Sequence, residues 1–541
     1  MSYTSLGFLL FTAIVVAAYF LMPARKYRWA VLLAASWFFY LYTSLRGSAY
    51  ILFTTVTTYA AALAIDRQIR ASKQTLKEKK GEWDRETRKR FKKTVERRKR
   101  LILAAVLLCN FGILAFLKYY NFGVESLSRL MGLASLSDHT LRLLLPLGIS
   151  FYTFQAMGYV IDVSREQAEA ERNILKLSLY ISFFPQIVQG PVGVYGELAH
   201  QLYEPHDFDF TRFKYGCELM LWGFFKKLVI ADRAVIAVNA AMEGGAILSF
   251  NGTTILFTLL IYALQLYTDF SGGIDISRGI AQILGIDMAI NFRQPFFAVS
   301  VSDFWRRWHI SLGNWMKNYL FYPIALSDRA LTATNRLLKT RFAKTPAGEH
   351  IVRVMFSCIA SLIVFLVVGV WHGAEWKCVA YGLYNGVIIA AATLLSPVFK
   401  WQNQKLHISP GSRLLKLFRI ARTFVLTLVG FLFDLIPGVR SFPQMLGRII
   451  LQQDLAAARL EIRDGLSLLL SEYVLLAAGA AIVFAVGILR ELRPERSLRQ
   501  ALDRRPYLLR STLIFACVMV ILVYGVYGGE YDAASFVYMQ F

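Results

Sequence analysis

The chain has 541 residues, of which 56% are hydrophobic and only 18% are charged, and its mean hydropathy is positive, at +0.45. A soluble domain is not this apolar from end to end, so the composition excludes an ordinary soluble globular protein. The formal net charge of +24 would point to nucleic acid in a soluble protein. Here the basic residues gather in loops between apolar runs, as in membrane proteins. We therefore expect a lipid bilayer, and no nucleic acid, as a partner.

Apolar runs near the length of about 20 residues that a membrane-crossing helix needs recur along the whole chain. Residues 143–323 hold several further runs that are interrupted. The sequence therefore predicts an all-α polytopic membrane protein with about eleven to thirteen transmembrane and re-entrant helices. The clear runs are residues 5–23, 29–45, 48–65, 101–118, 351–371, 376–396, 416–436, 472–490 and 509–528.

The first apolar run is expected to remain in the mature protein rather than to be removed as a signal peptide. No Lys or Arg precedes it, whereas Arg25, Lys26 and Arg28 follow it. This pattern places the N-terminus outside the cytoplasm and residues 24–28 inside it. Two further crossings then bring residues 66–100 to the cytoplasmic side.

Residues 66–100 form the one long hydrophilic block, with 16 Lys or Arg against 6 Asp or Glu. The block is rich in helix-forming residues, which predicts a charged helical hairpin. Such a hairpin suits contact with anionic lipid headgroups.

The C-terminal half follows the same charge rule. Basic loops at residues 329–344, 400–422 and 490–510 are expected in the cytoplasm. Residues 437–471 then fall outside, and their Leu and Ile spacing predicts a helix lying on the membrane surface. The C-terminus is also expected outside. The five cysteines are odd in number and show no C-x-x-C spacing, so we read them as packing residues.

Two stretches in the middle of the chain indicate a cavity inside the membrane region. Residues 182–193, SFFPQIVQGPVG, place Pro, Gly and Gln in an apolar setting, where broken backbone is tolerated only inside protein or beside water. Residues 266–279, LYTDFSGGIDISRG, repeat the theme with Asp269 and Ser271. An intramembrane acid is by default a functional candidate. The equally weighted alternative is a structural ion pair with Arg278, Arg306 or Arg307.

Residues 303–324 show the spacing of one amphipathic helix with interfacial tryptophans. Trp305, Trp308 and His309 recur with other apolar residues at i, i+3 and i+4 positions. Arg306 and Asn314 fall mostly off this face. A lone histidine on an aromatic face is more often a packing residue than a catalyst.

Of the seven histidines, only His309 and His372 are embedded in apolar sequence. The pair indicates a shared intramembrane site. No metal-ligand spacing is present, although His309, His372 and Asp269 could in principle share a metal. A buried neutral imidazole can serve as a general base that takes a proton from an attacking hydroxyl. Trp371 can wall off water beside His372.

Several stretches resemble the membrane-bound O-acyltransferase (MBOAT) family, in the bacterial branch that includes the alginate O-acetyltransferase and the teichoic-acid D-alanyltransferase. The resemblance runs nearly end to end. Its motifs are LPLGISFYTFQAMGYVIDV (145–163), FFPQIVQGPV (183–192), WGFFKKLVIADR (222–233), YALQLYTDFSGGIDISRGIAQILGI (262–286), NFRQPFFAVSVSDFWRRWHISLGNWMKNYLFYPI (291–324) and GVWHGAEW (369–376).

The resemblance implies a ring of helices around a central funnel, with the family's invariant histidine at His372 and its second polar position at His309. His372 would be the base, and His309 would orient or polarise a thioester. Asp269, Ser271, Trp305, Arg306, Asn314 and Trp371 would support the funnel or tunnel. We expect the chain to consist of N-terminal membrane helices (1–65), a basic cytoplasmic loop (66–100), the catalytic core (101–436) and a C-terminal part (437–541). The C-terminal part would comprise an extracytoplasmic surface helix, membrane helices and the tail.

The implied reaction moves an acetyl group from cytoplasmic acetyl-CoA, with no bound cofactor and no metal, toward an exported or cell-wall polysaccharide. The ending FVYMQF (536–541) resembles the tail of the acetyltransferase members. Tyr538 would then accept the acyl group transiently, or the tail would dock an extracytoplasmic acetyl-transfer partner. The polysaccharide biosynthesis machinery and the cytoplasmic (inner) membrane are the expected surroundings.

Two other functions compete with this interpretation. A D-alanyl transferase, or one for another acyl group, would take its acyl group from a carrier-protein thioester, and a basic cytoplasmic face suits an acidic carrier equally well. A transporter would also use broken helices and intramembrane acids. The two halves of the chain show no internal repeat, however, and transport does not need paired histidines.

Overall fold

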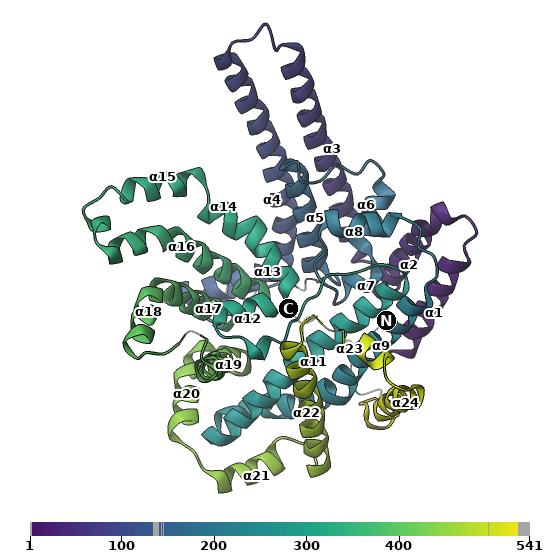
Figure 1. Ribbon diagram of the computed structural model, residues 1–541, viewed down its shortest axis with the longest axis vertical. Helices are drawn as coiled ribbons and strands as arrows, with labels where there is room; N and C mark the ends of the chain where they lie inside the picture. Colours follow the sequence, from purple (N-terminus) through teal and green to yellow (C-terminus); the bar gives the residue numbers. More distant parts are fainter. Residues whose placement is uncertain are drawn as a thin grey trace. The chain divides into compact units, whose positions relative to one another are not determined.

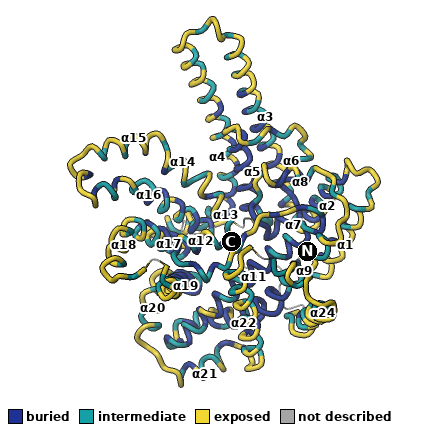
Figure 2. The backbone as a smooth tube through the Cα atoms, viewed as in Figure 1, coloured by how far each residue is buried: buried dark blue, intermediate teal, exposed yellow. Residues whose placement is uncertain are grey.

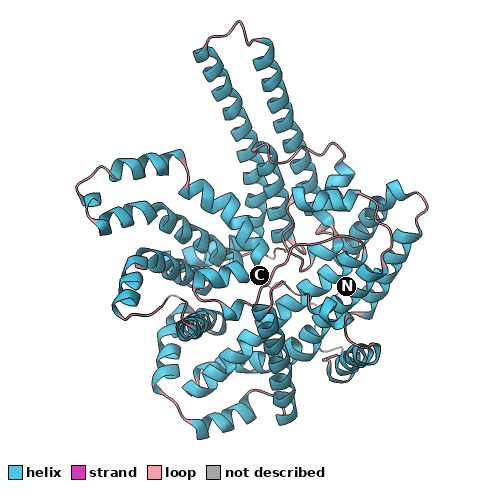
Figure 3. Ribbon diagram, viewed as in Figure 1, coloured by secondary structure: helices cyan, strands magenta, loops and turns pink. Residues whose placement is uncertain are grey.

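The computed structural model describes residues 3–133, 140–141, 143, 145–409, 411–495 and 497–527, and within these ranges every regular element is a helix, with loops and turns between the helices (Figure 1; Figure 3). The all-α class expected from the sequence is confirmed. The contacts divide the chain into two compact units. Unit 1 comprises residues 1–217 and 277–289, and unit 2 comprises residues 218–276 and 290–541.

Unit 1 contains the helices of the N-terminal third of the chain. They are α1 (Leu6–Leu21), α2 (Arg28–Thr43), α3 (Ser48–Glu78), α4 (Arg85–Met131), α5 (Ile149–Ser164), α6 (Ile174–Ser182), α7 (Phe184–Ile187) and α8 (Tyr195–Tyr203). Helices α9 (Phe210–Phe224) and α11 (Gly252–Ile283) carry residues of both units.

The basic block at residues 66–100 is a helical hairpin, as the composition predicts. Helices α3 and α4 run through it without a break and are joined by residues 79–84 (Figure 1). The Asp84 carboxylate accepts a hydrogen bond from the backbone N–H of Thr87 at 3.0 Å, which starts α4 with an acidic cap. Most side chains at the tip are exposed (Figure 2).

The interrupted backbone predicted at residues 182–193 is present. Helix α6 ends at Ser182, α7 is a single turn, and the chain is then irregular up to Val194. The segment is buried, and side chains satisfy its carbonyls. The Tyr3 hydroxyl donates to Pro185 O at 2.6 Å, and Gln186 Nε2 donates to Pro191 O at 2.6 Å. Irregular backbone is thus held inside protein, as an apolar environment requires.

Unit 2 holds the remaining helices. They are α10 (Asp232–Met242), α12 (Val301–Arg307), α13 (Ile310–Met316), α14 (Tyr322–Ala325), α15 (Asp328–Leu337), α16 (Pro346–His372), α17 (Trp376–Leu394), α18 (Ser396–Lys405), α19 (Arg413–Leu435), α20 (Phe442–Leu451), α21 (Leu455–Gly465), α22 (Leu470–Leu492), α23 (Leu498–Asp503) and α24 (Tyr507–Tyr524), with π-helical turns η3 (Phe225–Ala231) and η6 (Lys317–Phe321).

Residues 266–279, unlike residues 182–193, lie in unbroken helix, because α11 is continuous over 32 residues. The glycines serve packing instead. An added Cβ at Gly223 would lie 2.7 Å from the carbonyl oxygen of Gly272, and one at Gly272 would lie 3.0 Å from that of Gly223. The two backbones approach so closely that only glycine fits at the crossing.

Residues 303–324 do not form one helix, as the amphipathic spacing predicts, but several short ones. Helix α12 ends at Arg307, α13 begins at Ile310, and a π-helical turn separates α13 from α14. The first break falls at His309, whose φ of 47° and ψ of 53° are left-handed. Neither proline nor glycine marks this break, so the residue spacing gave no sign of it.

Seven helices of the described residues are long and apolar enough to cross a membrane: α3, α4, α11, α16, α17, α22 and α24. Shorter apolar helices at Leu6–Leu21 and Ile174–Ile187 add to them. The expected total of eleven to thirteen included such partial helices, and the polytopic membrane class is confirmed. Between residues 437 and 471 two short helices, α20 and α21, stand where one surface helix was expected.

Candidate active site

His309 occupies the break between α12 and α13, and the neighbouring segment holds that break in place. The backbone N–H of Ile310 donates to the carbonyl of Asn291 at 3.0 Å, and the N–H of Arg293 donates to the carbonyl of Arg307 at 2.9 Å. A non-glycine residue in left-handed backbone is strained, and such residues cluster at functional sites. The fold therefore enforces the conformation of His309 from both sides.

The imidazole of His309 is 2% exposed and lies among aromatic rings. The Phe270 ring of α11 meets it edge-on at a centroid distance of 4.8 Å, and Trp371 lies at 5.8 Å. His309 is outside the seven candidate spans. Burial, and secondarily the nearby His372, hold the pKa of its imidazole well below the ordinary value of 6.5. The ring is therefore neutral at neutral pH.

His372 is the last residue of α16, and its ring lies 5.1 Å from that of Trp371 and 5.6 Å from that of Tyr381 on α17. The structure thus brings the two histidines to one site, where both contact Trp371. Gly373 follows in extended backbone. An added Cβ there would come within 2.7 Å of the Cys378 sulfur, so the turn out of α16 leaves no room for a side chain.

Trp305 on α12 joins this ring cluster from the other side. Its indole N–H donates to Asn385 Oδ1 at 3.0 Å, and its ring lies 6.3 Å from Tyr381. Tyr381 therefore contacts both Trp305 and His372. The aromatic walls around the two histidines come from α11, α12, α16 and α17, which makes the site dependent on the packing of helices far apart in sequence.

Asp269 and Ser271 belong to a buried ion-pair cluster just beside this site. Lys227 Nζ lies 2.5 Å from Asp269 Oδ1 and 2.7 Å from Asp232 Oδ1. Lys226 Nζ lies 2.7 Å from Asp275 Oδ2 and donates to the Ser271 hydroxyl at 2.8 Å. Both lysines come from the π-helical turn η3, a kind of turn that is frequent at functional sites.

The structural alternative for Asp269, a buried ion pair, is therefore present. Its carboxylate pairs with Lys227, a cation that the sequence interpretation did not name. The lysine and the acid come from helices that cross at Gly223 and Gly272, so the pairing depends on a helix contact. Phe270, the next residue, then meets the His309 ring.

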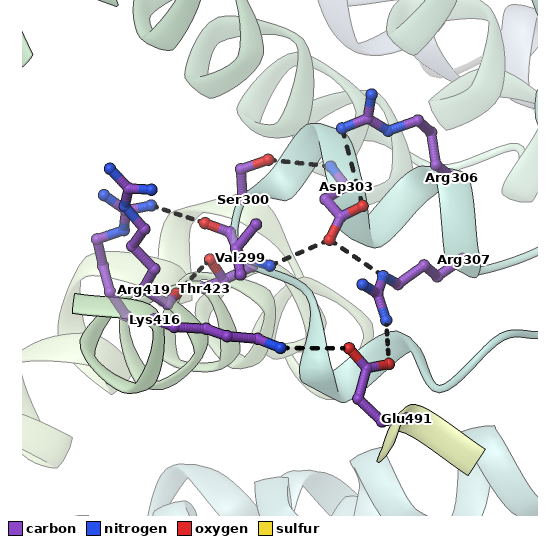
Figure 4. Close-up of polar contacts among 10 residues, drawn as sticks. Val299, Ser300, Asp303, Arg306, Arg307, Lys416, Arg419, Thr423 and Glu491 are labelled. Carbon is purple, nitrogen blue, oxygen red and sulfur yellow. Dashed lines mark hydrogen bonds and ion pairs between the residues drawn. The ribbon is translucent and has the colours of Figure 1, made fainter. Parts of the chain in front are cut away.

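Arg306 and Arg307 extend from the end of α12 into a polar network (Figure 4). Arg307 bridges two acids, with Nε 3.0 Å from Asp303 Oδ2 and Nη1 2.8 Å from Glu491 Oε2. Lys416 of α19 lies 3.8 Å from the same Glu491. Arg306 is largely exposed and 3.7 Å from Asp303. The network ties α12, and hence His309, to α19 and α22.

Two further predicted site residues are not brought to the histidines by any observed contact. Asn314 is exposed on α13 and accepts a hydrogen bond from Lys317 at 3.4 Å. Tyr538 lies outside the described residues. Asn314 as a funnel residue and Tyr538 as an acyl acceptor both stay predictions.

The sequence interpretation missed the residues that hold the site together. Lys226 and Lys227 carry two adjacent charges in an apolar run, and that signal alone marks them as intramembrane candidates. Asn291 and Tyr381 carry no such signal, because one asparagine and one tyrosine among 27 are common residues. In the part of the chain that the structure describes, no group of three His, Cys, Asp or Glu is arranged to hold a metal ion.

The segment that carries His309, Asn291 and both buried lysines also identifies the family. Residues 163–340 match the MBOAT, membrane-bound O-acyltransferase family. This part of the chain is similar to the membrane-bound O-acyltransferase family. The resemblance seen in the motifs is confirmed, as is the O-acyltransferase class at the level of the family. His372 lies beyond the matched segment.

Curated relatives of the chain carry three kinds of name. It is 29% identical over 430 residues to "Probable alginate O-acetylase AlgI" of Azotobacter vinelandii, covering 78% of this chain and 72% of that protein. It is 30% identical over 320 residues to "Peptidoglycan O-acetyltransferase" of Helicobacter pylori, covering 54% of this chain and 55% of that protein. It is 28% identical over 293 residues to "Teichoic acid D-alanyltransferase" of Bacillus subtilis, covering 53% and 67%. The chain thus spans little more than half of the Helicobacter protein.

Proposed function

We propose that this chain is an O-acetyltransferase that takes an acetyl group from a cytoplasmic thioester and passes it across the membrane for the O-acetylation of an exported or cell-wall polysaccharide. The observation that carries the proposal is the meeting of His309 and His372 at Trp371, in a site walled by aromatic rings. The names of two relatives, an alginate O-acetylase and a peptidoglycan O-acetyltransferase, support the acetyl group and the polysaccharide acceptor.

In the proposed reaction His372 is the general base. Its imidazole accepts the proton of the acceptor hydroxyl while that oxygen attacks the carbonyl carbon of the thioester. A carbon–oxygen bond forms, the carbon–sulfur bond breaks, and the proton passes from His372 to the departing sulfur. His309 assists by orienting the reacting groups. A positioned proton acceptor contributes on the order of 10²–10⁴-fold to the rate.

The donor is proposed to be acetyl-CoA, which reaches the site from the cytoplasm. Its phosphates are anionic, and the basic loops at residues 329–344, 400–422 and 490–510 favour the approach of such a ligand. The acceptor side faces an extracytoplasmic acetyl-transfer partner, docked by the tail that contains Tyr538. The biosynthetic machinery of the polysaccharide supplies the final acceptor.

The proposal is tested by offering purified protein in proteoliposomes two labelled donors, acetyl-CoA and a D-alanyl thioester on a carrier protein. Of the two donors, we expect only acetyl-CoA to react, with release of free coenzyme A and transfer of the label to an added acceptor. Reaction of only the carrier thioester would instead assign a D-alanyl transferase function to the chain. Donor-independent movement of a solute, without thioester cleavage, would overturn the enzyme proposal in favour of a transporter.

A further inference from the structure

We propose that Asn291 is a positioning residue that fixes the tautomer of His309, with the proton on Nδ1 and none on Nε2. His309 would then receive a hydrogen bond from an N–H or O–H group of a substrate, other than the hydroxyl whose proton passes to His372, and it would not donate one to a thioester carbonyl. The tautomer follows from the contacts of Asn291, whereas its use in acyl transfer rests on the proposed function.

Two hydrogen bonds fix the orientation of the Asn291 carboxamide. Its Oδ1 accepts hydrogen bonds from the backbone N–H of Ser311 at 2.9 Å and from the Ser311 hydroxyl at 2.9 Å. A backbone N–H can only donate, so the atom facing it must be the oxygen. The side chain is 1% exposed and has no freedom to turn over without losing this bond.

The orientation of the Asn291 carboxamide determines which imidazole nitrogen of His309 carries the hydrogen. The Nδ1 atom of its imidazole lies 3.4 Å from the same Asn291 Oδ1. An oxygen that is already accepting presents only lone pairs, so the nitrogen facing it must carry a hydrogen. A neutral imidazole holds one N–H, and the hydrogen bond of one nitrogen sets the state of the other. Nε2 is therefore the basic nitrogen.

The backbone of Asn291 also helps to hold His309 in place. The carbonyl of Asn291 accepts the N–H of Ile310 at 3.0 Å, directly after the left-handed His309. Asn291 thus holds the residue after His309 with its main chain and the imidazole with its side chain. Phe270 and Trp371 limit the ring from α11 and α16. His372, at the end of α16, is a titratable group whose charge lowers the pKa of His309.

The tautomer excludes one of the two roles that the sequence left open for His309, which were to orient or to polarise a thioester. Polarising a thioester carbonyl needs an N–H that points at the carbonyl oxygen. With Nδ1–H directed at Asn291, a neutral His309 offers only the lone pair of Nε2 to a substrate. It can orient a substrate by accepting a hydrogen bond from an N–H or O–H group other than the hydroxyl whose proton passes to His372.

The direct test is nitrogen NMR of the full-length protein in lipid, with all histidines labelled with ¹⁵N. The His309 signals are identified by their loss in His309→Gln. We expect a protonated Nδ1 and an unprotonated Nε2 at neutral pH. A protonated Nε2 in the unaltered protein would overturn the proposal, and this reading requires neither enzymatic activity nor an Asn291 variant that folds.

A second test uses Asn291→Asp, which keeps the accepting oxygen and the shape but adds a negative charge. The charge favours the imidazolium, so the pKa of His309 should rise by about one unit or more. The acidic limb of the pH–rate profile should move to higher pH by the same amount. A lower rate with an unchanged limb would show a merely structural role. Ser311→Ala, the matched control, removes one donor to the same oxygen and should leave the limb in place.

The two tests separate failure of the inference from failure of the proposed function. The expected NMR tautomer, combined with full acyl transfer by His309→Gln, would keep the positioning role and remove His309 from the reaction. The opposite tautomer, combined with loss of transfer in His309→Gln, would keep the function and assign the orientation of His309 to another group.

Discussion

The two histidines differ in how their surroundings were built, although the sequence marked both in the same way. His372 stands at the end of a regular helix and contacts rings from its own and the next helix. His309 depends on a strained backbone and on Asn291. The sequence predicted the two histidines as a pair because they are the histidines embedded in apolar sequence. The ring partners of His309 could not be predicted, because one of them, Trp371, lies 62 positions further along the chain.

The pH dependence of acyl transfer should reflect the lowered pKa of His309. Below its pKa an imidazole holds two protons and cannot accept another, so activity is lost on acidification. Because burial lowers that pKa below 6.5, the acidic limb attributable to His309 should lie below pH 6.5. The measurement is the initial rate between pH 5 and 8 with a fixed donor. A limb above 6.5 that vanishes in His309→Gln would contradict this.

Lys227 should be far more important for stability than an exposed lysine. It pairs with both Asp269 and Asp232 and is fully buried, so Lys227→Met leaves two buried carboxylates without their cation. Removing one partner of a buried pair costs about 3–5 kcal/mol. Thermal unfolding in detergent should show a large loss for Lys227→Met and almost none for Lys80→Met at the exposed hairpin tip. Equal transitions for the two variants would refute the structural role of Lys227.

At the scale of elements, composition and length were enough to place the helices but not their interruptions. The clear apolar runs correspond to helices such as α3, α16 and α22. The glycine pair at residues 272–273 does not break α11, in which Gly272 allows a close helix crossing. The break at His309 was missed because histidine adopts left-handed backbone only where surrounding contacts enforce it.

The crossing of α9 and α11 gives a prediction for glycine. Gly223→Ala would place a methyl group 2.7 Å from the Gly272 carbonyl oxygen, so the helices must separate. We expect a loss of about 1–3 kcal/mol and a lower thermal transition. The matched control is Gly112→Ala on α4, which meets no atom within 4 Å and should be neutral or stabilising. Equal effects would contradict the close-packing explanation.

At the scale of the whole molecule, the sequence predicts a membrane protein of known family but not how its parts assemble. Hydropathy identifies spans because each helix must satisfy its own backbone in lipid. The division into two compact units depends on contacts between distant segments, such as residues 277–289 with the N-terminal part. The expected ring and funnel, like the domain boundaries at residues 65, 100 and 436, stay predictions.

The orientation in the membrane can be tested at the turn of the α3–α4 hairpin. The charge rule places residues 66–100 in the cytoplasm. In a background without native cysteines, Gly81→Cys at this exposed turn should react with an impermeant maleimide in inside-out vesicles and not in intact spheroplasts. Labelling in intact spheroplasts alone would reverse the predicted topology of the N-terminal part.

The central claim is that the site at Trp371 carries out acyl transfer through His372. The most direct measurement is the rate of coenzyme A release from acetyl-CoA by reconstituted His372→Ala, with His200→Ala on the exposed face of α8 as the control. The account predicts a loss of about 10²-fold or more for His372→Ala, with an unchanged thermal transition, and full activity for His200→Ala. Undiminished transfer by folded His372→Ala would contradict it.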